Sequence, residues 1–198
     1  MPAERRSQKQ AKPATARVFF ALWPSPEVAG GLGDIAQEAA RSFGGRATRI
    51  DTIHLTLAFL GNVAEARLPE LSMAAASVRV APFAININQL GFWLHNHLLW
   101  AGCQAPSAPL NLLYSQLCKA LAQAGFRVGG EGRDFAPHVT LVRRVAEASA
   151  PSERHPLPSI EGFAWRNERF VLVRSTLSAQ GSSYQIIDEF PLTAGFNA

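Results

Sequence analysis

A pattern of histidine, an apolar residue, threonine and leucine occurs twice in this chain. The first copy is His54-Leu55-Thr56-Leu57 and the second is His138-Val139-Thr140-Leu141. In a strand, residues two apart point to the same face, about 7 Å from each other. Each histidine therefore shares a face with its threonine, while the alternate apolar residues face the core. We expect the two strands to face one another across a cleft and to present both polar pairs to one phosphate.

Two such imidazoles can divide acid–base catalysis at a phosphodiester. Near neutral pH the unprotonated one activates a nucleophile, and the protonated one gives its proton to the leaving oxygen. The hydroxyls of Thr56 and Thr140 can donate to non-bridging oxygens as negative charge develops there. Such a pair of imidazoles needs no metal or other cofactor, and neither copy contains a carboxylate that would argue for a different mechanism. Ordinary strand histidines beside β-favouring threonines would explain one copy, but two copies in phase favour catalysis.

Other residues leave alternatives open. His95 and His97 have a spacing that suits a metal, yet no cysteine or carboxylate stands nearby, and exposed histidines in a turn are the favoured interpretation. Some aromatic residues could stack a nucleobase or belong to the core, and some arginines could line the cleft or lie on the surface. The aromatic candidates are Phe59, Phe92, Trp93 and Trp100, and the arginines are Arg144 and Arg174.

Composition limits the class of protein. The chain has 198 residues, of which 47% are hydrophobic, as expected for a globular protein with a substantial core. The formal charge is +4, but four basic residues and one acidic residue stand in the first sixteen positions, so the rest is nearly neutral. This distribution favours a small acidic ligand or a short nucleic-acid contact over a broad duplex-binding face.

The ends and the cysteines point to the cytoplasm. Residues 1–16 lack the apolar region of a secretory signal and are predicted to be a disordered basic tail, and no apolar run is long enough to span a membrane. Cys103 and Cys118 are expected to be reduced, although a disulfide between them stays an alternative.

The pattern of segments predicts one α+β domain over residues 17–198. Strands are expected at 17–24, 54–61, 83–93, 97–103, 169–177 and 184–190, with a further strand at the second histidine motif, and helices at 25–43, 65–80 and 107–125. Repeated strand–helix–strand units suggest two similar lobes, each an antiparallel sheet with helices packed outside, enclosing a central cleft.

The two histidine motifs and their flanking residues resemble those of a known family. The segments "HLTLAFLG" and "PHVTLVRR" are similar to the motifs of the two-histidine (2H) phosphoesterases, in particular the bacterial and archaeal RNA 2′,3′-cyclic phosphodiesterases, also called 2′-5′ RNA ligases. The resemblance extends over residues 17–192. It implies a monomeric enzyme that hydrolyses the 2′,3′-cyclic phosphate of RNA ends or nucleotides to a 2′-phosphate. Two alternatives stay open: 2′-5′ RNA ligation at the same site, or an RNA- or nucleotide-binding module without turnover.

The resemblance also implies roles for individual residues. His138 would be the general base and His54 the general acid. Thr56 and Thr140 would hold the phosphate, and Arg143 would contact the ligand. We add Phe59 as a candidate for stacking the base. Ala136 departs from the family pattern, because many relatives have an arginine before the second motif, and this puts affinity for longer RNA in question.

Overall fold

The computed structural model describes residues 14–105, 107–129, 134–178 and 181–195. Its main sheet has the strand order β10-β9-β1-β3-β7-β6-β5, with β2 beside β7, and all its pairs are antiparallel. A separate sheet pairs β4 with β8. The strands are β1 (Thr15–Leu22), β2 (Arg46–Ala47), β3 (Leu55–Ala64), β4 (Phe83–Ile87), β5 (Gln89–Trp93), β6 (Leu98–Gly102), β7 (Val139–Arg143), β8 (Phe163–Asn167), β9 (Arg169–Ser178) and β10 (Gly181–Pro191).

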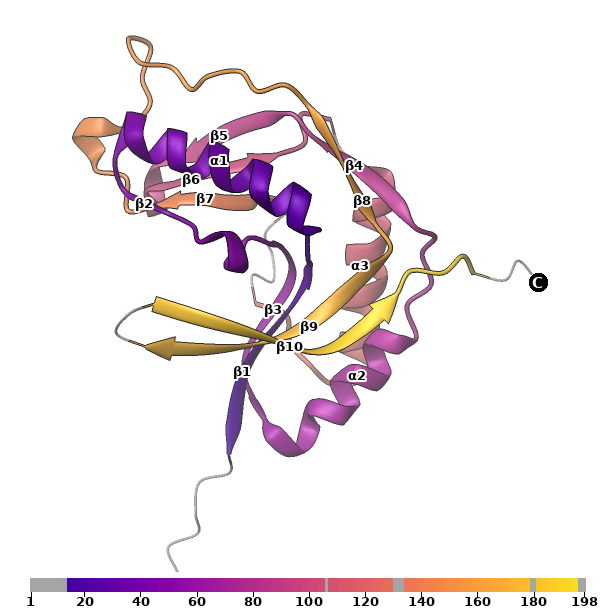
Figure 1. Cartoon of the computed structure of the whole chain (residues 1–198). Helices are drawn as coiled ribbons and strands as arrows, with labels where there is room; N and C mark the ends of the chain where they lie inside the picture. Colours follow the sequence, from indigo (N-terminus) through magenta and orange to yellow (C-terminus); the bar gives the residue numbers. More distant parts are fainter. Residues whose placement is uncertain (1–13, 106, 130–133, 179–180, 196–198) are drawn as a thin grey trace, which may run out of the picture.

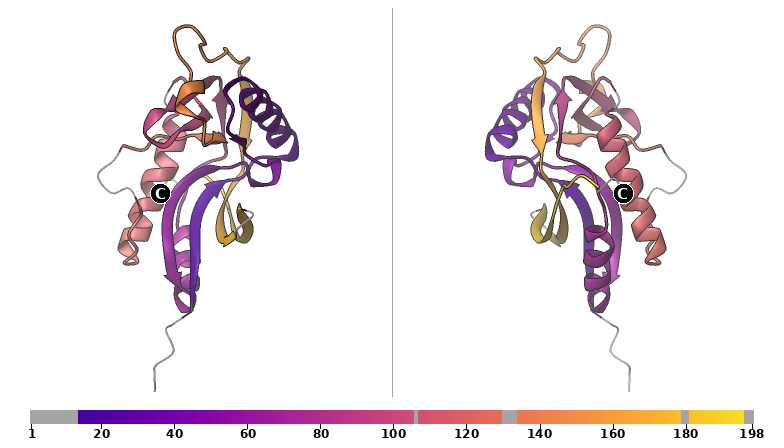
Figure 2. Two further views of the ribbon diagram at one scale, coloured as in Figure 1. Left: turned by 90° about the vertical axis from the view of Figure 1, so that its left-hand side faces the viewer. Right: turned by 90° about the vertical axis from the view of Figure 1, so that its right-hand side faces the viewer.

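The main sheet consists of two halves joined at one point. Strands β3 and β7 carry the two histidine motifs and are neighbours, but their ladder is the single pair Leu55 and Val139. On one side of it lie β1, β9 and β10, and on the other lie β2, β6 and β5 (Figure 1). Figure 2 shows β1 and β3 curving together along one half. The motif strands therefore lie edge to edge and then diverge, where we expected them to face one another across a cleft.

The first helix begins and ends where the sequence predicts. In α1 (Pro26–Phe43), the Ser25 hydroxyl accepts a hydrogen bond from the main-chain nitrogen of Val28 at 3.3 Å, and Pro26 occupies the first turn. Gly44 follows the helix with a φ of 70°, a conformation that glycine adopts readily.

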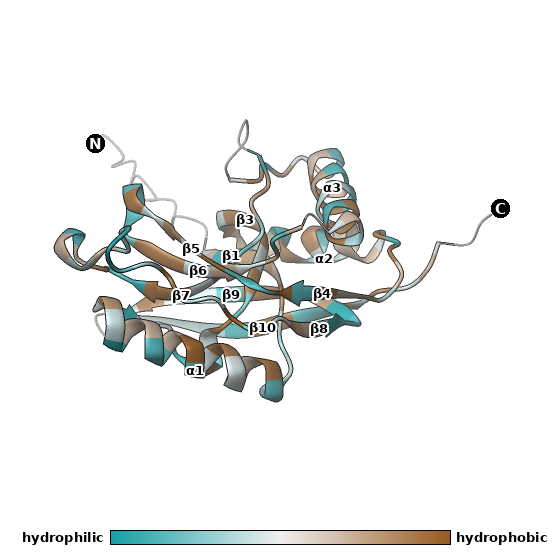
Figure 3. Ribbon diagram, turned by 90° about the horizontal axis from the view of Figure 1, so that it is seen from above, coloured by the Kyte–Doolittle hydropathy of each residue, from teal (hydrophilic) through white to brown (hydrophobic). Residues whose placement is uncertain are grey.

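All three helices share one core with the apolar face of the motif strands. In α3 (Ala108–Gln123), Leu110, Leu113, Leu117 and Leu121 are fully buried, as the predicted stripe requires. Side chains of α1 and α2 (Leu68–Ala76) join the same cluster, which contains Leu55, Leu57, Val139 and Leu141. Figure 3 shows α1 on one side of the strands and α2 and α3 on the other. The prediction of an α+β fold with antiparallel strands and covering helices is confirmed, and no described helix is long and apolar enough to cross a bilayer.

Some boundaries differ from prediction. The strand expected over 83–93 is two strands, because Asn88 interrupts it: its side-chain oxygen accepts from the Gln104 main-chain nitrogen at 2.8 Å, and β4 leaves to pair with β8. Strand β8 was not predicted. The first strand begins at Thr15, inside the expected tail, whose residues 1–13 lie outside the described part of the chain. The closing hairpin of β9 and β10 is confirmed.

Two glycines after α1 provide a matched test of how closely β2 packs against β7. Gly44 and Gly45 both have positive φ, 70° and 86°, so alanine costs about 1–3 kcal/mol of strain at either position. A methyl group on Gly44 would meet nothing within 4 Å, whereas one on Gly45 would lie 2.7 Å from the carbonyl oxygen of Arg143. We expect Gly45→Ala to lower the free energy of unfolding in urea by roughly 1–3 kcal/mol more than Gly44→Ala. Equal losses would show that β2 adjusts freely.

Candidate active site

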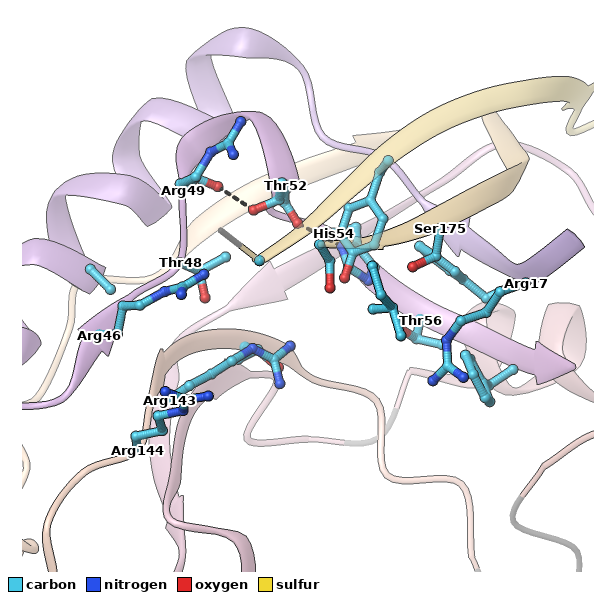
Figure 4. A pocket seen from close by; sticks show the side chains of 18 residues that line it. Arg17, Arg46, Thr48, Arg49, Thr52, His54, Thr56, Arg143, Arg144 and Ser175 are labelled. Atoms are coloured by element: carbon cyan, nitrogen blue, oxygen red, sulfur yellow. Dashed lines mark hydrogen bonds between the residues drawn. The ribbon is translucent and has the colours of Figure 1, made fainter. Parts of the chain in front are cut away.

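A cavity of about 560 Å³ is lined by side chains of β1, β2, β3, β7, β9 and β10 and of the loops beside them (Figure 4). We call it the arginine cavity because Arg17, Arg46, Arg49, Arg143 and Arg144 line it. Its lining also includes His54, Thr56, Phe59 and Thr140, which the sequence singled out. Side chains from both halves of the main sheet thus meet at one opening, beside the pair that joins the halves.

Bulges in β3 and β7 turn the side chains of Phe59 and Arg143 toward the cavity. In a regular strand Phe59 would point away from the face of Thr56, and Arg143 away from that of Thr140. Phe20 and Ala21 of β1 pair with Ala58 and Thr56, so Leu57 is an extra residue in β3. Leu99 and Trp100 of β6 likewise pair with Val142 and Thr140, which makes Leu141 an extra residue in β7. Each bulge reverses the alternation once and brings the later side chain to the cavity.

Both motif histidines are held in the same way. The Nδ1 atom of His54 lies 2.7 Å from the carbonyl oxygen of Thr52, and that of His138 lies 2.8 Å from the carbonyl oxygen of Ala136. A carbonyl oxygen only accepts, so Nδ1 carries the proton in each ring. The Nε2 atom is then left to exchange a proton with a bound group.

Aromatic rings enclose His54. Its ring stacks on Trp23 with centroids 5.5 Å apart, and Phe19 and Tyr184 stand 4.9 and 5.2 Å away. This burial, opposed by the hydrogen bond to Thr52 and reinforced by the charges of Arg143 and His138, lowers the pKa of His54 from 6.5 to about 4. The imidazole is therefore neutral at pH 7.

His138 lines a second cavity. It lines a smaller cavity of about 280 Å³ beside Trp93, whose ring centroid is 4.4 Å from its own, and does not line the arginine cavity itself. Burial lowers the pKa of His138, the hydrogen bond to Ala136 opposes this, and Arg143 lowers it further. Arg143 acts on both imidazoles, and His138 acts on His54, so the two rings lie within electrostatic range of each other.

The arginine cavity suits an anion. Arg49 is paired with Asp51, and the Arg17 guanidinium lies over the Phe59 ring at 4.6 Å from its centroid. None of the described residues that line the cavity is acidic. In Figure 4, Arg143 and Arg46 lie on one side of His54 and Thr56, and Arg17 lies on the other. A phosphate bound beside His54 would meet cationic groups from two directions.

Only some of the remaining residues that the sequence singled out line one of the two cavities. Arg144 lines the arginine cavity, whereas Arg174 binds Glu65 through hydrogen bonds of 2.7 and 2.8 Å and Phe92 lines neither cavity. Trp93 and Trp100 line the smaller cavity. His95 and His97 belong to no cluster of metal-ligating residues among the described positions, and both cysteines are free. Sequence reasoning missed Arg17, Arg46, Ser175 and Tyr184, although Arg17 and Phe19 already alternate on one face of the first strand.

The comparisons point to one family. A model of the 2′-5′ RNA ligase superfamily matches residues 24–178. The chain is 32% identical over 184 residues to the RNA 2′,3′-cyclic phosphodiesterase of Thermus thermophilus, covering 89% of this chain and 90% of that protein. It is 32% identical over 152 residues to the protein of the same name from Escherichia coli, covering 75% and 81%. The crystal structure of E. coli LigT complexed with 3′-AMP matches with a TM-score of 0.78 and 28% identity, over 91% of this chain and 99% of that one.

The lowered pKa of His54 predicts how stability depends on pH. Between pH 6.5 and about 4 the unfolded chain binds a proton at this residue and the folded chain does not, so stability falls as the pH falls through this window. We expect His54 to account for a loss of about 2 kcal/mol in the free energy of unfolding between pH 7 and pH 5.

His54→Gln, which stays neutral, is the matched variant, because all other titrating groups are common to both proteins. Its stability, measured by urea unfolding, should fall less between pH 7 and pH 5 than that of the unmodified protein. Parallel profiles would show that His54 is protonated as readily in the folded chain as in the unfolded one.

Proposed function

The chain belongs to the 2′-5′ RNA ligase superfamily, and we propose that it hydrolyses the 2′,3′-cyclic phosphate of RNA ends or nucleotides, with His54 and His138 as the acid–base pair. One observation carries the proposal. Two imidazoles, each just before one of the neighbouring strands β3 and β7, are hydrogen-bonded through Nδ1 to the carbonyl two residues earlier, and one of them, His54, lines a cavity with five arginines. The names of the relatives from T. thermophilus and E. coli support the same reaction.

The reaction follows from the free Nε2 atoms. Nε2 of His138 takes a proton from water as the water oxygen forms a bond to phosphorus. The bond from phosphorus to O3′ breaks, and His54 gives its proton to O3′. The product is a 2′-phosphate with a 3′-hydroxyl. The hydroxyls of Thr56 and Thr140 donate to the non-bridging oxygens, while Arg143 balances the charge that develops there.

Substrate binding provides the protonated imidazole that the reaction needs. The surroundings lower the pKa of each histidine, so both are neutral near pH 7. A bound phosphodiester anion offsets the positive charge of Arg143 and raises both pKa values. An imidazolium of low pKa is also the stronger acid, which suits His54 for donating to an alkoxide. The split between acid and base rests on the family resemblance and on this argument.

Phe59 and Arg17 give the arginine cavity a place for the terminal base. The Phe59 ring lines the cavity near Thr56, and the Arg17 guanidinium already covers one part of it. A nucleobase stacked on Phe59 would gain contact with both a ring and a cation. Formation of a 2′-5′ bond would use the same groups: a 5′-hydroxyl would take the place of water, give its proton to His138 and bond to phosphorus, while the bond from phosphorus to O3′ breaks and O3′ takes a proton from His54.

Hydrolysis without metal is the first expected outcome. Purified protein incubated with adenosine 2′,3′-cyclic phosphate in EDTA should release a monoester at the same rate as without EDTA, because the two imidazoles supply the acid and the base. Phosphorus NMR should identify a 2′-phosphate. Binding without turnover would support a non-catalytic module instead, and activity lost in EDTA and restored by zinc or manganese would overturn the two-histidine mechanism.

The two histidines should act as one unit. His54→Ala and His138→Ala should each lower kcat by about 100- to 10,000-fold. The double variant should be scarcely worse than either, since removing one proton transfer leaves little for the other to contribute. His155→Ala, an exposed histidine outside both cavities, is the control. Multiplicative losses would count against a shared transition state.

A substrate with sulfur in place of O3′ separates the acid from the base. A thiolate leaves without protonation, so loss of the general acid should matter little for this substrate. His54→Ala should then hydrolyse it at close to the rate of the unmodified protein, while His138→Ala stays impaired. The opposite pattern would exchange the two assignments.

A further inference from the structure

The smaller cavity beside His138 is built on two tryptophans, and we call it the tryptophan cavity. Trp93 and Trp100 line it with ring centroids 5.5 Å apart and planes at 39°. The remaining lining comes from the segment after β6, the start of α3 and residues 136–138. Its volume of about 280 Å³ is near the lower end of the range for ligand sites, roughly 300 Å³ upward.

Glycines let Trp100 lie flat against the sheet. Gly91 pairs with Trp100 across β5 and β6, and a methyl group added to it would stand 2.1 Å from the Trp100 ring. A methyl on Gly102 would stand 3.1 Å from the same ring. The indole therefore occupies the space that side chains at these two positions would fill. This packing holds the ring as a fixed, planar wall of the cavity.

The two cavities differ in charge. Five arginines line the arginine cavity, whereas the described lining of the tryptophan cavity has no charged side chain apart from His138 when protonated. Amide groups of Gln104 and Asn111 and the hydroxyl of Ser107 provide neutral donors and acceptors. The tryptophan cavity therefore suits a flat, uncharged group with polar edges, and not a second phosphate.

The tryptophan cavity is also continuous with the proposed catalytic groups. His138 lines it, and Trp100 is the cross-strand partner of Thr140, which lines the arginine cavity. We propose that the tryptophan cavity binds a second nucleobase of the substrate, while the terminal base lies at Phe59. This inference rests on the proposed function, and it makes RNA ends of two or more nucleotides the preferred substrate over mononucleotides.

Affinity for reaction products tests the subsite without requiring turnover. Calorimetry should compare adenosine 2′-phosphate with the dinucleotide ApA carrying a terminal 2′-phosphate. The unmodified protein should bind the dinucleotide roughly tenfold more tightly, as expected for stacking one more base. Trp100→Leu should lose most of this preference while its affinity for adenosine 2′-phosphate changes less than threefold.

A glycine pair supplies the second variant and its control. Gly91→Ala should also lose the preference, because the new methyl displaces the Trp100 ring. Gly31→Ala, where a methyl would meet nothing within 4 Å, should keep it. The proposal is overturned if the unmodified protein shows no preference, if Trp100→Leu retains it, or if both ligands weaken equally. If hydrolysis is absent but the preference holds and depends on Trp100, the proposed function fails and the subsite stands.

Discussion

The backbone pairing of Leu55 with Val139 is the contact on which the site depends. It alone joins the ladders of β3 and β7, and both side chains are almost fully buried in the shared core. Because the two strands run antiparallel through this pair, His54 lies toward the Thr140 end of the match and Thr56 toward the His138 end. A longer ladder would hold the strands together and close the opening. Because they diverge after one pair, the polar side chains meet while space for a ligand remains.

The surroundings of that opening destabilise the protonated form of both histidines and would stabilise a bound anion. Burial and Arg143 lower the pKa of both imidazoles. An anion in the arginine cavity would compensate both effects, since it adds negative charge to a cavity whose described lining includes five arginines and no acidic side chain. Proton affinity and ligand binding are therefore linked through Arg143, and the acid form of either imidazole becomes accessible mainly when the substrate is present.

Local patterns predicted the elements, and pairing between distant strands decided the details of the site. The Ser25 and Pro26 helix start, the leucine stripe of α3 and the closing hairpin each depend on neighbours in sequence, so they could be predicted. The bulges at Leu57 and Leu141 depend on the partner strands β1 and β6 and leave no local signal. Without them, alternation would turn Phe59 and Arg143 away from the cavity. The position of the Arg174 side chain depends on its hydrogen bond to Glu65, which is more than a hundred residues away in the sequence.

The two histidine motifs follow the same sequence pattern and make the same Nδ1 hydrogen bond. The motifs themselves therefore do not decide which histidine is the acid, or in which direction the substrate binds. The surroundings supply both. His54 is enclosed by three aromatic rings and opens on the arginines, whereas His138 rests against Trp93 and borders the uncharged tryptophan cavity. A phosphodiester with bases on it would find charge on one side and flat apolar surface on the other. The asymmetric walls would therefore set the orientation of the substrate, and that orientation would decide which imidazole faces the leaving oxygen.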